Sequence, residues 1–161
     1  MPLDPFDPLL ADAVLVIAAV LLFYAAFTDL RHYTIRNELI VVLAGLFFVH
    51  ALAAGRWAEL PWNLALAAIM LIAMLYFYAR DWMGGGDVKL LTVAFLWTGP
   101  HCALVFAVLL LVFAALHALA ARLGLMRSQQ GDADARRIPF APSIAAALIG
   151  VFMLGCLQPG A

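Results

Sequence analysis

One polar stretch interrupts this strongly apolar chain: Trp82-Met83-Gly84-Gly85-Gly86-Asp87-Val88-Lys89-Leu90-Leu91. It places three glycines, a carboxylate and an ammonium group between two long apolar segments. A second carboxylate, Asp29, follows the first apolar segment of the chain. Ionisable groups next to membrane-like segments are costly to accommodate, and are functional candidates for that reason. We therefore take Asp29 and Asp87 as the leading candidates for a functional pair.

The composition predicts a membrane protein. The chain has 161 residues, of which 67% are hydrophobic and only 12% are charged. Soluble domains carry about 25% charged residues, so this chain has more apolar surface than a soluble core could bury. Membrane lipid is the expected environment. With a net charge of −1 and no basic, aromatic-rich surface, no nucleic-acid partner is expected. The N-terminal residues lack the basic region of a secretory signal.

Six apolar segments follow one another along the chain, at about residues 11–28, 39–54, 62–79, 88–98, 102–121 and 138–157. They predict an all-α polytopic membrane protein with six transmembrane helices in a single domain over residues 1–161. The fourth segment is short, because its length as a helix is roughly 16 Å against a hydrocarbon core of ~30 Å. Gly99-Pro100 is expected to break the chain after it.

The basic residues predict the orientation. With six spans, alternate loops fall on opposite sides of the membrane, and eight of the nine basic residues fall on one side. That side carries Arg31, Arg36, Arg80, Lys89, Arg122, Arg127, Arg136 and Arg137. Only Arg56 falls on the other side. The positive-inside rule then places Asp29 and Asp87 at the cytoplasmic face and both termini outside the cytoplasm.

Two aspartates at one membrane face suit the hydrolysis of a peptide bond. Because two neighbouring carboxylates cannot both ionise cheaply, one of them keeps a proton. The ionised member can take a proton from water, while the neutral member donates one to the carbonyl oxygen under attack. We expect the glycines to give the backbone near Asp87 conformations closed to other residues. Lys89 could keep Asp87 ionised or extend to the interface, and we favour the second.

The remaining polar groups suggest no further chemistry. His50, His101 and His117 lie on apolar segments or turns, and no pair of them has metal-ligand spacing, so we expect packed or interfacial histidines and no metal or other cofactor. Cys102 and Cys156 could form a disulfide, but we favour two separate buried cysteines. The sequence does not indicate an oligomeric state.

Several motifs together resemble the type IV prepilin peptidases, which are intramembrane aspartic proteases of the Gly-x-Gly-Asp type. Gly84, Gly86 and Asp87 match that motif, and Lys89 follows it. The first polar loop matches as well, and the entry to the last span looks like the family's proline-containing entry. The matching residues there are Asp29, Arg31, Ile35, Asn37, Pro139, Phe140 and Pro142. The chain departs from the family at Arg36, where proline is common, and at Ala141, where glycine is common.

The resemblance implies an aspartic endopeptidase of the bacterial inner membrane, with Asp29 and Asp87 as catalytic residues. It implies a substrate, the prepilin or pseudopilin precursor, whose basic leader is removed at the cytoplasmic face. Long members of the family carry an N-terminal region with cysteine pairs and also methylate the product. This chain looks like the short form that serves Tad/Flp-type pilus secretion systems, so no methyl transfer is expected.

Two other kinds of protein remain as alternatives. A small ion- or proton-coupled transporter would use the same two aspartates to bind ions at a broken helix. The absence of an internal repeat, and the position of both acids toward one face, argue against it. In a scaffold subunit, the two aspartates would have no chemical role.

Overall fold

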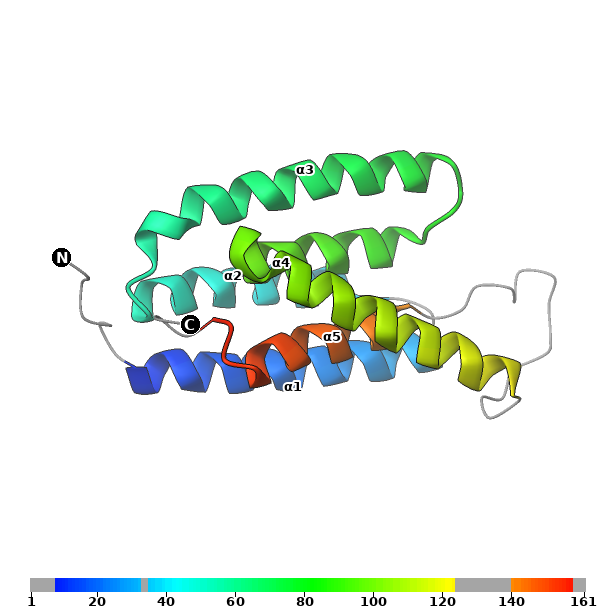
Figure 1. The fold of residues 1–161 in the computed structure, drawn as a ribbon, viewed down its shortest axis with the longest axis horizontal. Coiled ribbons are helices and arrows are strands. Elements are labelled where there is room, and N and C mark those ends of the chain that lie inside the picture. The colour runs from blue at the N-terminus through cyan, green and yellow to red at the C-terminus, as the bar shows by residue number, and fades with distance from the viewer. Residues whose placement is uncertain (1–7, 33–34, 124–139, 158–161) are drawn as a thin grey trace.

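The computed structural model describes residues 8–32, 35–123 and 140–157, and in these ranges the regular structure is entirely helical. The elements are α1 (Pro8–His32), α2 (Asn37–Ala53), the short 3-10 helix η1 (Trp57–Glu59), α3 (Leu60–Ala79), α4 (Gly85–Arg122) and α5 (Ala141–Met153). Helices of this apolarity satisfy their own backbone hydrogen bonds, as a bilayer requires. Figure 1 shows the helices lying side by side in one elongated bundle.

Helix α4 is two helices joined at a sharp reversal. Gly99 has a φ of 57° and a ψ of −175°, which is not helical, and Pro100 follows it. Phe95 and Phe106, on either side of the break, have ring centroids only 5.2 Å apart. In a straight helix these residues would be roughly 16 Å apart. The chain therefore turns back on itself at Gly99, as Figure 1 shows, and the break expected at Gly99-Pro100 is confirmed.

Contacts at the helix ends show that successive segments run in opposite directions. The start of α1 packs on the end of α2 through Ala11, Ala53 and Ala54. The end of α3 meets the start of α4, where a Cβ on Gly85 would touch the Tyr78 ring. Helix α5 packs against both α1 and α4. Among the residues that the structure describes, three helices are long and apolar enough to cross a membrane: Pro8–His32, Trp57–Ala79 and Gly85–Ala120. Because the third reverses at Gly99, its two halves are shorter than that range suggests.

The interior is centred on Trp97 in the first half of α4. Its ring is 1% exposed and contacts the side chains of Phe47, His50 and Phe152. Its indole Nε1 donates a hydrogen bond of 3.0 Å to the Leu43 carbonyl oxygen. One tryptophan thus joins α2, α4 and α5. Many other large apolar side chains, such as Ile72 and Leu111, are exposed on the outside of the bundle, where lipid would solvate them.

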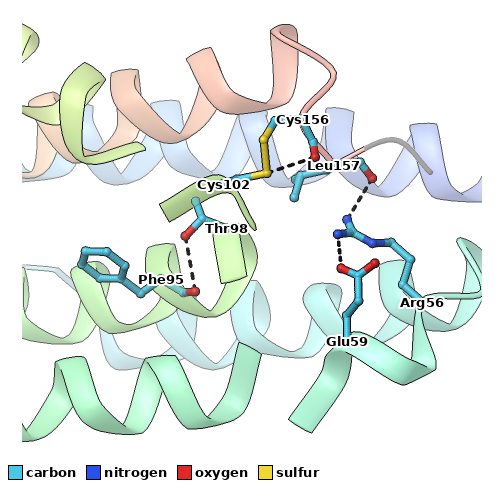
Figure 2. Close-up of a disulfide and its surroundings, with 7 residues drawn as sticks. All are labelled: Arg56, Glu59, Phe95, Thr98, Cys102, Cys156 and Leu157. Atoms are coloured by element: carbon cyan, nitrogen blue, oxygen red, sulfur yellow. Dashed lines mark hydrogen bonds and ion pairs between the residues drawn. A yellow bond between two sulfur atoms is a disulfide. The ribbon is translucent and has the colours of Figure 1, made fainter. Parts of the chain in front are cut away.

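Cys102 and Cys156 form a disulfide, so our expectation of two separate cysteines is wrong. The bond joins the start of the second half of α4 to the turn after α5, and the two Cα atoms are 6.1 Å apart. Figure 2 shows it beside the α4 reversal. No local motif indicates the pairing, because the two residues lie in separate segments, 54 positions apart, and meet only when α5 packs along α4.

Candidate active site

Asp29 lies in the last turn of α1 and is only 6% exposed. Its Oδ2 accepts a hydrogen bond of 3.3 Å from the backbone N–H of Ala141, the first residue of α5. The first N–H groups of a helix have no partner within the helix, and no side chain of Phe140, the residue before α5, caps them. The buried carboxylate of Asp29 takes that role. It therefore anchors the start of α5 to the end of α1.

Asp87 lies in the first turn of α4 and is half-buried. The structure brings it close enough to Asp29 for the two charges to interact. The first half of α4 and the end of α1 are separated by α2 and α3 in the sequence, yet both lie at the same end of the bundle. We call this end, which holds Asp29, Asp87 and the start of α2, the aspartate end.

The three glycines before Asp87 have an unexpected role. None of them has a positive φ, so our expectation of unusual backbone conformations is wrong. Because glycine has no side chain, these positions leave room for neighbouring groups. A Cβ on Gly84 would lie 3.4 Å from Oδ2 of Asp87, and a Cβ on Gly86 would lie 3.4 Å from the Ile35 side chain. The positive φ in this region, 56°, belongs to Asp81, which ends α3 and directs the chain into the glycines.

The supporting residues fall into separate groups. Lys89 is exposed, and its Nζ donates a hydrogen bond of 2.8 Å to Oδ1 of Asn37, the first residue of α2. The guanidinium of Arg31 lies over the Phe27 ring, 4.5 Å from its centroid. Pro139 lies outside the described residues. The structure thus joins the first loop to the glycine motif through Asn37 and Lys89, and through Ile35 and Gly86.

Sequence reasoning missed two groups near Asp29. One is the Ala141 N–H, which depends on how α5 packs against α1. The other is His117 in the second half of α4, which is close enough to Asp29 for their charges to interact. Its Nε2 is buried, with no hydrogen-bond partner in the part of the chain that the structure describes. No sequence motif links His117 to Asp29, so only the fold reveals this proximity.

The chain also matches the sequence model of a known protein family. The model of the type IV leader peptidase family matches residues 16–121, which is more than half of the chain and includes both aspartates and the glycine motif. The chain belongs to the type IV leader peptidase family. The resemblance seen in the sequence is thereby confirmed, and the transporter alternative gains no support. The matched range ends before α5, so the last helix and its contact with Asp29 are described here from the structure alone.

Membership of the leader peptidase family makes this chain a peptidase-type, multi-pass membrane protein, in agreement with its long apolar helices. No curated protein and no solved structure matched the chain.

We expect the Lys89–Asn37 hydrogen bond to support cleavage by holding the start of α4 against the start of α2. Lys89→Met or Asn37→Ala alone should lower kcat/KM about threefold to tenfold, the usual range for losing one such bond. Because both changes remove the same bond, the double variant should be little worse than either single variant. Fully additive losses in a peptide-cleavage assay would contradict a shared role.

The same loop offers a matched control. Arg36 and Glu38 form an ion pair whose side chains are 68% and 73% exposed. Exposed pairs contribute little, so Glu38→Gln should leave the cleavage rate within about twofold of wild type.

Proposed function

We propose that this protein is an aspartic endopeptidase that removes the basic leader from Tad/Flp-type pilin precursors, with Asp29 and Asp87 as its catalytic residues. The observation that carries the proposal is that two carboxylates from distant helices lie within range of each other's charge at one end of the bundle, in a chain of the leader peptidase family. Prepilins or pseudopilins are the substrates, and a single membrane domain does the chemistry without a cofactor.

The chemistry follows from two carboxylates that share one proton. The ionised carboxylate removes a proton from a water molecule, and the resulting hydroxide attacks the carbonyl carbon of the scissile bond. The neutral carboxylate gives its proton to the carbonyl oxygen. Collapse of the tetrahedral intermediate then breaks the C–N bond, and the amide nitrogen leaves with a proton from the pair. The Ala141 N–H occupies one oxygen of Asp29 and leaves the other for the water.

The activity is tested by co-expressing the protein with a Tad/Flp-type pilin precursor and measuring the mass of the pilin. We expect loss of the leader and a new N-terminus without a methyl group. If a folded, membrane-inserted wild-type protein leaves the precursor intact, the proposed substrate is wrong. A product heavier by one methyl group would show that methyl transfer is retained.

We also propose six spans in the bacterial inner membrane, with the aspartate end at the cytoplasmic face and both termini outside. Two independent observations support this orientation. Eight of nine basic residues fall at or between the ends of apolar segments on the proposed cytoplasmic side, as the positive-inside rule requires. The Cys102–Cys156 disulfide lies at the other end of the bundle, beside the α4 reversal. Disulfides persist in oxidising compartments such as the bacterial periplasm and are rare in the cytosol.

Two exposed tryptophans allow a matched test of the orientation. Trp57 begins η1 near the α4 reversal, whereas Trp82 precedes the glycine motif, and they are 50% and 72% exposed. In a chain with Cys102→Ser and Cys156→Ser, we expect Trp57→Cys to react with a membrane-impermeant maleimide in intact spheroplasts. Trp82→Cys should react only after the membrane is permeabilised. The reverse pattern would invert the proposed topology, and equal labelling of both would rule out six spans.

A further inference from the structure

A small polar cavity lies at the end of the bundle away from the aspartates, which we call the disulfide end because Cys102 and Cys156 pair there. Its lining includes His50, Arg56, Glu59, Asn63 and Trp97. The residues come from α2, the segment around η1, the start of α3 and the first half of α4. The cavity volume is about 10 Å³, which is roughly the space that one water molecule needs.

Two polar atoms of the lining residues are buried and have no hydrogen-bond partner within the described ranges. They are Nε of Arg56, which is a donor, and Oδ1 of Asn63, which is an acceptor. A buried polar group without a partner is costly. Native proteins commonly satisfy such groups with ordered water. One donor and one acceptor, both on residues that line the same cavity, can therefore each form a further hydrogen bond.

The other polar atoms of Arg56 and Asn63 each make one hydrogen bond, and these bonds hold both side chains in place. Nη1 of Arg56 donates to the Leu157 carbonyl oxygen at 2.9 Å, and Nη2 pairs with Glu59, as Figure 2 shows. Nδ2 of Asn63 donates to the Leu96 carbonyl oxygen at 3.1 Å. Turning the Asn63 amide over would place its oxygen against that carbonyl oxygen, and two acceptors cannot bond.

We infer that the cavity binds one ordered water molecule, which accepts a hydrogen bond from Arg56 Nε and donates one to Asn63 Oδ1. The occupant must accept and donate at once, must be the size of water and must be neutral. An anion would meet the carbonyl-type oxygen of Asn63 and the carboxylate of Glu59. A cation would meet the guanidinium of Arg56. Water satisfies all three requirements.

The bound water completes a polar link that holds the α4 reversal. Pro100 has no N–H, so the Leu96 carbonyl lacks its usual partner four residues later, and Asn63 supplies the missing donor. Through the water, Asn63 is joined to Arg56 and so to the Leu157 carbonyl. Four segments of the disulfide end are then connected by hydrogen bonds. This inference does not depend on the peptidase activity.

A high-resolution structure of the full-length protein in a lipid phase is the direct test. We expect an ordered density peak within about 2.7–3.2 Å of both Arg56 Nε and Asn63 Oδ1. A dry cavity with both side chains in the described positions would overturn the inference. So would a peak with the coordination of an ion.

A double-mutant cycle supplies a second measurement that does not require crystals. Arg56→Lys keeps the charge opposite Glu59 but removes Nε, and Asn63→Leu removes the acceptor at similar size. If one water bridges the two side chains, their effects on the unfolding equilibrium constant in detergent should be non-additive by about threefold or more, because bridged residues share a partner. Both variants that contain Asn63→Leu lose the hydrogen bond to the Leu96 carbonyl, so the cost of that loss cancels in the cycle. Additive effects would show that no shared water joins the two residues.

Discussion

Asp87→Asn is expected to abolish leader cleavage while leaving the protein folded. Asparagine has nearly the same shape as aspartate but neither loses nor gains a proton at the required step. General acid–base groups typically contribute about 10²- to 10⁴-fold to the rate, so the loss in kcat should be at least of that order. The measurement is leader removal in membranes, with the amount of folded protein determined alongside. Asp29→Asn should have a similar effect, because the proposed mechanism needs both carboxylates.

Asp81→Asn is the matched control for Asp87→Asn. Asp81 is exposed, lies six positions before Asp87 in the same polar stretch, and has a φ of 56°. Asparagine tolerates such a backbone conformation as well as aspartate does. This variant should cleave at about the wild-type rate. Normal cleavage by Asp87→Asn, or inactivity of Asp81→Asn with the fold intact, would remove the basis for an Asp29–Asp87 pair.

A third variant separates the two roles of Asp29. In Asp29→Asn an amide oxygen can still accept the hydrogen bond from the Ala141 N–H, so the start of α5 should stay in place. In Asp29→Ala that N–H loses its partner, which costs about 1–3 kcal/mol when the group is buried. We therefore expect both variants to be inactive but only Asp29→Ala to lose thermal stability as well. Equal stability of the two would show that the Asp29–Ala141 contact does not anchor α5.

Gly99→Ala is expected to cause the largest loss of stability of any single methyl addition to this chain. The combination of φ 57° and ψ −175° at Gly99 belongs to a region that is essentially restricted to glycine, and residues held there cost about 1–3 kcal/mol. A Cβ would in addition lie 2.3 Å from Oδ1 of Asn63, so the side chain that supplies the Leu96 carbonyl with a donor would have to move. We expect a total loss of at least about 3 kcal/mol, measured by thermal or denaturant unfolding in detergent.

Gly45→Ala serves as its control. Gly45 lies inside α2, and a Cβ there would meet nothing within 4 Å. Because alanine favours a helix over glycine by roughly 0.5–1 kcal/mol, this variant should be as stable as wild type or more so. Combining Gly99→Ala with Asn63→Ala should relieve the collision but not the backbone strain, so stability should recover only in part. Wild-type stability of Gly99→Ala would mean that the chain does not reverse at this residue.

Features that depend only on residues close together in the sequence were predictable. The apolar segments gave an all-helical protein, and Gly99-Pro100 gave the break in α4, since glycine and proline act on the backbone where they stand. The family was evident from Asp29 and the glycine motif. The assignment of Asp29 and Asp87 to catalysis, the number of spans and the orientation stay predictions. For these, the structure contributes the proximity of the two carboxylates and the position of the disulfide.

Features that depend on two distant segments meeting were not predictable. The sequence favours two separate cysteines, because nothing near Cys102 or Cys156 indicates that the turn after α5 ends beside the α4 reversal. The glycines near Asp87 suggest unusual backbone conformations, whereas in the structure they leave room for Ile35 and for the Asp87 carboxylate. The role of Asn63 was not predictable either. Its partner, the Leu96 carbonyl, is on another helix and lacks a backbone donor because Pro100 has no N–H.

The unequal lengths of the packed helices have a consequence for the surrounding lipid. Helix α1 has 25 residues, whereas α5 has 13, so they extend about 37 Å and 20 Å respectively at 1.5 Å per residue. Helices that differ this much cannot all match a single hydrocarbon thickness, and a bilayer adapts to a short helix by thinning beside it. Thinning next to α5 and the first half of α4 would bring the headgroup layer toward Asp29 and Asp87. Such thinning would also bring water closer to the two proposed catalytic carboxylates.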